Sequence, residues 1–122
     1  MIAGTEYSPE KAFIAFARQF FEQMAESNYG AALAGLDSAE RRWSKAELVA
    51  SFSAALGDQI ICSANGFTKS ASPSVSELTS GHFVLRHKVP AGSKWSNAVA
   101  IFHFIRKPGT GYYHVRFLGV EP

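Results

Sequence analysis

The stretch that decides the fold is GHFVLRHKVPAGSKWSNAVAIFHFIRKPGTGYYHVRFLGV, residues 81–120. Apolar and polar side chains alternate along most of it, which is typical of β-strands with two unlike faces. Two short polar connections, at residues 91–94 and 107–111, contain the glycines that tight turns favour. We therefore predict a meander of antiparallel hairpins. The predicted strands are residues 59–62, 67–77, 81–89, 97–107 and 111–120.

The first half of the chain follows the helical period instead. A first helix is predicted from Ser8-Pro9 to about Ser27, because a capping serine and a proline precede apolar residues spaced three and four apart. A short second helix is predicted from Asn28 to about 37–38. Ser44 and Glu47 form a capping box that starts the third helix, which Gly57 ends. The predicted fold class is α+β, with three N-terminal helices packed on a curved antiparallel sheet.

Length and composition fit one domain spanning residues 1–122. Hydrophobic residues make up 47% of the chain and charged residues 18%, which supplies a core and is too few charges for disorder. No signal-peptide pattern or membrane-length apolar segment is found, so we expect a cytoplasmic protein without a membrane partner. Cys62 is the only cysteine and is interpreted as a buried apolar residue. No cofactor or metal is predicted.

Sorting the side chains of the last three strands by parity predicts two faces with different chemistry. One set is apolar apart from two histidines and is predicted to face the helices: Phe83, Leu85, His87 and Val89; Val99, Ile101, His103 and Ile105; Tyr113, Val115 and Phe117. The other set is basic and aromatic: His82, Val84, Arg86 and Lys88; Ala98, Ala100, Phe102, Phe104 and Arg106; Tyr112, His114, Arg116 and Leu118.

Aromatic rings on a face without helices would expose apolar area bordered by cations, a pattern typical of contact surfaces. The predicted protein-binding anchors are Trp95, Phe102, Phe104, Arg106, Tyr112 and Arg116. The partner is either a foreign protein or a second copy of the chain, in a homodimer through the sheet. A third interpretation remains open, in which these rings pack under the arginine stems or beneath residues 67–77.

The charges are unevenly distributed along the chain. Residues 1–62 carry five basic and eight acidic side chains, whereas residues 63–122 carry seven basic and two acidic ones. A division this uneven favours an electropositive face and an acidic surface on the partner. Nucleic acid is the less favoured partner, because the basic residues are few and the aromatic motif of the common RNA-binding sheet is not present.

The order of elements resembles the nuclear-transport-factor-2-like superfamily, which has a cystatin-like fold. The resemblance rests on three helices, the third entered through Arg41-Arg42-Trp43-Ser44-Lys45-Ala46-Glu47-Leu48, before a sheet that ends in Tyr112-Tyr113-His114-Val115-Arg116-Phe117. Val89-Pro90-Ala91-Gly92-Ser93-Lys94-Trp95-Ser96 is also similar to a loop in small bacterial proteins of this type. The likeness is architectural and covers nearly the whole chain.

The resemblance implies a cone with a pocket between helices and sheet, and frequent dimerisation through the sheet. It implies functions ranging from isomerases and dehydratases to scaffolds and bacterial immunity proteins that neutralise a toxin. Fold alone does not assign one of these activities.

Enzymes of this superfamily commonly use a carboxylate in the pocket, which is poorly supplied here. The only aspartates, Asp37 and Asp58, are predicted at helix ends or turns. His87 and His103 remain as acid–base candidates, although a core or pocket-rim histidine satisfied by a hydrogen bond is the simpler interpretation. The alternative site is a pocket lined by Phe16, Phe20, Trp43, His87 and His103.

Three functional hypotheses follow from these observations. The leading one is a non-enzymatic protein-binding module, of the immunity-protein kind, that uses the sheet face and the Trp95 loop. The alternative is a small-molecule-binding protein or an isomerase- or dehydratase-like enzyme with a histidine-lined cone pocket. The third is a homodimeric scaffold without a ligand of its own.

Overall fold

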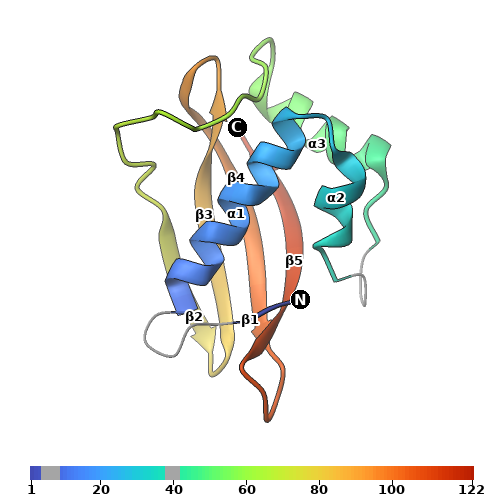
Figure 1. Ribbon diagram of the computed structural model, residues 1–122, viewed down its shortest axis with the longest axis vertical. Coiled ribbons are helices and arrows are strands. Elements are labelled where there is room, and N and C mark those ends of the chain that lie inside the picture. The colour runs from blue at the N-terminus through green and yellow to red at the C-terminus, as the bar shows by residue number, and fades with distance from the viewer. Residues whose placement is uncertain (4–8, 38–41) are drawn as a thin grey trace.

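The computed structural model describes residues 1–3, 9–37 and 42–122. Three helices pack against a five-stranded antiparallel sheet, with α1 running across the strands (Figure 1), so the predicted α+β fold class is confirmed. The elements are β1 (Ile2–Ala3), α1 (Pro9–Ala25), α2 (Tyr29–Ala34), α3 (Lys45–Leu56), β2 (Ser74–Thr79), β3 (His82–Ala91), β4 (Lys94–Arg106) and β5 (Tyr112–Glu121).

The sheet has the strand order β1-β5-β4-β3-β2, so consecutive strands from β2 to β5 are neighbours and form the predicted meander. Two predictions about strands are wrong, and one strand, β1, was not predicted. The segment 59–62 contributes a single bridge, between Ile61 and Ala91. The strand predicted from residue 67 begins at Ser74, and β1 is too short for alternation to reveal it.

Among the described residues, none of the helices combines the length and apolar character that a membrane span requires.

The helix α1 buries one face against the sheet, through Phe13, Ala17, Phe20, Phe21 and Met24. The predicted cap at Ser8 lies outside the described residues. At the other end, Asn28 caps α2 by accepting a hydrogen bond from the Ala31 N–H, as predicted. The helix α2 ends at Ala34, earlier than expected.

The helix α3 begins as the sequence predicts. The Ser44 hydroxyl accepts a hydrogen bond from the Glu47 N–H, and the Glu47 carboxylate accepts one from the Ser44 N–H, both at 3.1 Å. Gly57 follows the last turn with a φ of 62°, a conformation that glycine adopts without a Cβ clash. Leu48, Phe52 and Leu56 form the buried side of the helix.

We expect Ser44→Ala to lower the free energy of unfolding by about 1 kcal/mol, because it removes the acceptor of the Glu47 N–H. Urea denaturation followed by circular dichroism measures the loss. Ser53→Ala, at an exposed position of the same helix, is the matched control and should not destabilise the protein. Equal losses in the two variants would contradict a capping role for Ser44.

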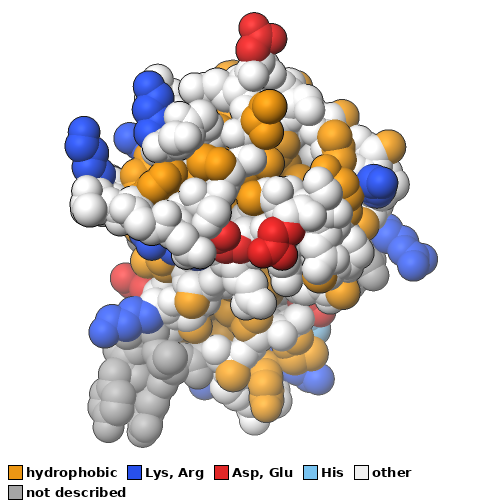
Figure 2. Space-filling view, turned by 45° about the horizontal axis from the view of Figure 1, so that its top comes forward, with side chains coloured by type: hydrophobic (Ala, Val, Ile, Leu, Met, Phe, Trp, Pro, Cys, Tyr) orange, Lys and Arg blue, Asp and Glu red, His pale blue; other side chains and the backbone are white. Residues whose placement is uncertain are grey.

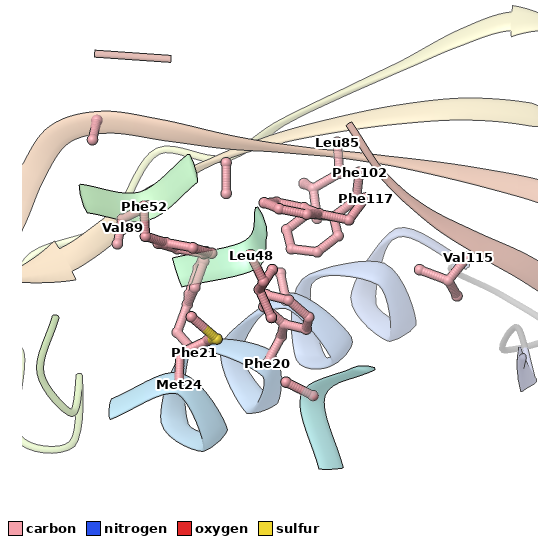
Figure 3. Close-up of a cluster of buried hydrophobic side chains, with 14 of the residues drawn as sticks. Phe20, Phe21, Met24, Leu48, Phe52, Leu85, Val89, Phe102, Val115 and Phe117 are labelled. Carbon is pink, nitrogen blue, oxygen red and sulfur yellow. The ribbon is translucent and has the colours of Figure 1, made fainter. Parts of the chain in front are cut away.

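The space between helices and sheet is filled by aromatic rings. Phe13 stacks on Phe104 with ring centroids 4.1 Å apart, and Phe20 meets the ring of Phe102 edge-on at 5.4 Å. In Figure 3, Phe102 and Phe117 reach from the sheet toward Phe20 and Leu48. These rings form one core that holds the helices against the sheet.

The register of β4 reverses its predicted orientation. Phe102 lies opposite Leu85 of β3 and Phe117 of β5, and Phe104 lies opposite Phe83 and Val115. The side chains of Ala98, Ala100, Phe102 and Phe104 are therefore buried on the helix side. The prediction that Phe102 and Phe104 are exposed, and that the alternate residues of β4 face the core, is wrong.

The reversal follows from the turn between β3 and β4. Gly92 and Ser93 form a two-residue connection with φ values of 63° and 65°, so Ala91 pairs with Lys94. A loop with an even number of residues pairs the odd-numbered residues of one strand with the even-numbered residues of the next strand. The buried side chain of Leu85 thus requires an even-numbered neighbour, which is Phe102.

Candidate interaction face of the sheet

The face of the sheet opposite the helices is called the outer face. Strand pairing assigns to it His82, Val84, Arg86 and Lys88 of β3, Val99, Ile101, His103 and Ile105 of β4, and His114, Arg116 and Glu121 of β5. Arg86 and Glu121 are exposed, and the other nine side chains are partly exposed.

The apolar part of the outer face runs along β4, which is the middle strand of the sheet. Val99, Ile101 and Ile105 project there, with His103 between the two isoleucines. Their neighbours on the flanking strands are charged or histidine side chains, apart from Gly119 opposite Ile101. Ile101 lies opposite Arg86 of β3, and Val99 lies opposite Lys88. The result is an apolar row with Lys88 and Arg86 along β3 and the carboxylate of Glu121 opposite Val99 on β5.

The charge of the outer face is mostly positive. The guanidinium of Arg86 pairs with Glu121 at 2.5 Å, and Glu121 is the only carboxylate that the described strands place on this face. Both partners of this pair are exposed, so the pair adds little to stability. Lys88 and Arg116 supply further positive charge, and the rings of His82 and His103 lie with centroids 5.5 Å apart.

The predicted anchors are not gathered on one surface. Phe102 and Phe104 are 0% exposed and belong to the core. Arg106 and Tyr112 are exposed beside the β4–β5 hairpin. Of the six anchors, Arg116 is the one that contributes to the middle of the outer face.

Trp95 lies at the other end of the sheet and packs on the helix side. The guanidinium of Arg18 on α1 stands 5.1 Å from its ring centroid, and the ring of buried His87 lies 5.4 Å away. Trp95 is therefore separate from the outer face.

The residues proposed to line a cone pocket are also separated. His87 points to the helix side of the sheet, whereas His103 points to the outer face, so the sheet lies between them. Phe16 and Phe20 pack in the aromatic core, and Trp43 donates a hydrogen bond from Nε1 to the Phe117 carbonyl at 2.9 Å. Neither histidine lines any of three surface cavities formed by the described residues, of which one includes Trp43.

His87 is a core histidine, fully buried beside the ring of Phe21. Its Nδ1 lies 2.8 Å from the Lys88 carbonyl, while Nε2 has no hydrogen-bond partner among the described residues. Burial lowers the pKa of His87, the Lys88 carbonyl opposes this, and the charge of Arg18 adds to the lowering. The net pKa is below the ordinary value of 6.5, so the ring is neutral near pH 7 and Nδ1 donates to Lys88.

Sequence reasoning missed the contact between Asp37 and His114. The Asp37 carboxylate accepts a hydrogen bond from the Val115 N–H at 2.7 Å and lies 3.4 Å from the His114 ring. Burial raises the pKa of Asp37, but the hydrogen bond from Val115 and neighbouring positive charge outweigh this effect. The net pKa of Asp37 is therefore below its ordinary value. A carboxylate with a lowered pKa is a weak base, and Asp37 instead ties the segment after α2 to the edge of β5.

Within residues 1–3, 9–37 and 42–122, no cluster of three His, Cys, Asp or Glu side chains that could hold a metal ion is found. Cys62, predicted to be buried, is partly exposed.

Comparison with known proteins finds no matching family model, no matching curated protein and no matching solved structure. The assignment of three helices on a five-stranded antiparallel sheet therefore rests on the structure alone.

Proposed function

We propose that the chain is a non-enzymatic protein-binding module that docks an acidic partner protein on the outer face of its sheet. The observation that carries this proposal is the apolar row Val99, Ile101 and Ile105, bordered by Lys88 and Arg116. An apolar centre with a polar rim is the usual anatomy of a protein interface. More specifically, we propose a toxin-neutralising immunity protein of the nuclear-transport-factor-2-like superfamily.

The charges favour a foreign partner over a second copy of this chain. A two-fold dimer brings the same patch of each subunit together, so Lys88 and Arg116 would face a surface with the same positive charge. Glu121 offers little compensation, because it already pairs with Arg86. An acidic surface would instead complement this face and speed association.

The environments of Asp37 and His87 add support for a binding role. Asp37 is engaged by a backbone hydrogen bond and His87 is enclosed in the core, so neither is placed to exchange protons with a substrate. Proton transfer requires a group within hydrogen-bond reach of the substrate.

The test compares two double variants with matched chemistry. Ile101→Asp with Lys88→Glu makes the outer face polar and reverses its charge, while Ala15→Asp with Lys11→Glu makes the same kinds of change on the exposed side of α1. Each tagged protein is used to capture partners from a lysate of the source organism, and circular dichroism verifies that each is folded.

We expect wild type and the α1 variant to retain the same acidic protein, and the outer-face variant to lose it. Retention by the outer-face variant, or capture of a basic protein by this face, would contradict the proposal. Light scattering provides a further check. A wild-type dimer that the outer-face variant converts to a monomer would assign the face to self-association instead.

A further inference from the structure

A cavity of about 300 Å³ lies between the end of the β3–β4 hairpin and the segment before β2. This end of the sheet is at the top left of Figure 1, and Figure 2 shows basic side chains gathered beside apolar surface at the upper left of the molecule. The cavity is lined by Gly66, Phe67, Thr68, Lys69, Ser93, Lys94 and Trp95.

The apolar wall of this cavity is held in place by several contacts. The indole Nε1 of Trp95 donates a hydrogen bond to the Lys69 carbonyl at 2.8 Å. The ring of Phe67 meets the Trp95 ring edge-on, with centroids 5.1 Å apart and planes at 86°. The Arg18 guanidinium also packs over the indole, with its Cζ 5.1 Å from the ring centroid. A wall fixed before binding loses little side-chain entropy when a ligand arrives.

The charged part of the lining is entirely positive. Lys69 and Lys94 are exposed at the cavity, and none of its seven lining residues carries a carboxylate. The hydroxyl groups of Thr68 and Ser93 can donate hydrogen bonds beside these two ammonium groups. An anionic group is therefore favoured in this cavity and a cationic one is disfavoured.

We propose that this cavity binds a small molecule that combines one or two aromatic rings with an anionic group such as a carboxylate. The volume lies at the lower end of the range of ligand pockets, which limits the ring system to this size. The ring contacts Phe67 and Trp95, and the anion lies between Lys69 and Lys94. The site is distinct from the outer face and does not depend on the function proposed for that face.

The test uses 2-naphthoate as the probe and two-dimensional ¹H–¹⁵N NMR of the labelled full chain as the readout. We expect saturable shifts of the Trp95 indole N–H and of the Gly66, Thr68 and Lys94 amides. 2-Naphthylmethanol keeps the rings without the charge, and inorganic phosphate keeps an anion without the rings. Each of these should bind at least about tenfold more weakly than naphthoate, because each lacks one of the two contacts.

The variant Lys69→Gln with Lys94→Gln should weaken naphthoate binding about tenfold, while Lys11→Gln with Lys107→Gln, at exposed sites elsewhere, should leave it unchanged. Either equal binding by both variants or shifts that avoid the cavity would overturn the proposal. Phosphate binding as tightly as naphthoate, or an absence of saturable shifts, would also overturn it. The outer-face variant keeps all seven lining residues, so this test and the partner test fail independently.

Discussion

Replacing Phe102 by alanine is expected to lower the free energy of unfolding by about 3–5 kcal/mol, the largest effect we predict. The side chain is 0% exposed. The centroid of its ring lies 5.4 Å from the ring centroid of Phe20 and 5.3 Å from that of Phe117. Truncation removes these contacts and leaves a cavity in the middle of the core. The loss is measured by urea denaturation.

Ile101→Ala is the matched control, because Ile101 is the neighbouring residue on the outer face and is partly exposed. We expect this change to cost about 1 kcal/mol, since the side chain is partly exposed and its truncation leaves no enclosed cavity. If Phe102→Ala does not fold, Phe102→Leu retains most of the volume and allows the same comparison. A larger loss for the change at Ile101 than for the change at Phe102 would contradict the observed orientation of β4.

The second large effect concerns the pH dependence of stability at His87. Its pKa in the folded protein is lowered, mainly by burial. Below the ordinary histidine value of 6.5, the unfolded chain therefore binds a proton that the folded protein does not bind. The free energy of unfolding should fall as the pH decreases from 6.5 to the folded pKa, by at most about 1.4 kcal/mol per pH unit.

Two variants separate this titration from packing at the same position. His87→Gln and His87→Phe both remove the imidazole but differ in how well they fill the space between Phe21 and Trp95. Chemical denaturation at about pH 7 and about pH 5 should show a smaller loss of stability in both variants than in wild type. An undiminished loss in both would mean that groups other than His87 cause the acid destabilisation.

The helices and the meander could be predicted because their signals are local. Ser44 and Glu47 lie three residues apart and need no distant partner to identify the start of α3. The glycines in the connections of the last two hairpins are likewise local signals, because they indicate a turn without reference to distant residues. Segments without such signals were predicted less well: Ile61 pairs with Ala91, a contact that local alternation does not reveal.

The orientation of β4 was predicted incorrectly because both of its faces are apolar. Ala100, Phe102 and Phe104 alternate with Ile101 and Ile105, so hydrophobicity alone cannot assign the core side. The signal that decides is the length of the connection at Gly92 and Ser93, which fixes the parity of the pairing.

The candidate site depends on that parity, which is why the residues of the outer face were predicted correctly on β3 and β5 but incorrectly on β4. Arg116 and Lys88 were assigned to the correct face, because β3 and β5 each have one clearly apolar side. The row of Val99, Ile101 and Ile105 was assigned to the core instead. The pairing of Asp37 with Val115 joins residues 78 positions apart and leaves no local trace.

Binding of an acidic protein to the outer face can be measured by calorimetric titration of the captured partner, once purified, with each variant. We expect Ile101→Asp with Lys88→Glu to weaken the affinity by about 100-fold or more, since it removes both an apolar anchor and a complementary charge. Ala15→Asp with Lys11→Glu should bind like wild type, and high salt should weaken wild-type binding. Equal affinities for the two double variants would show that the outer face is not the binding surface.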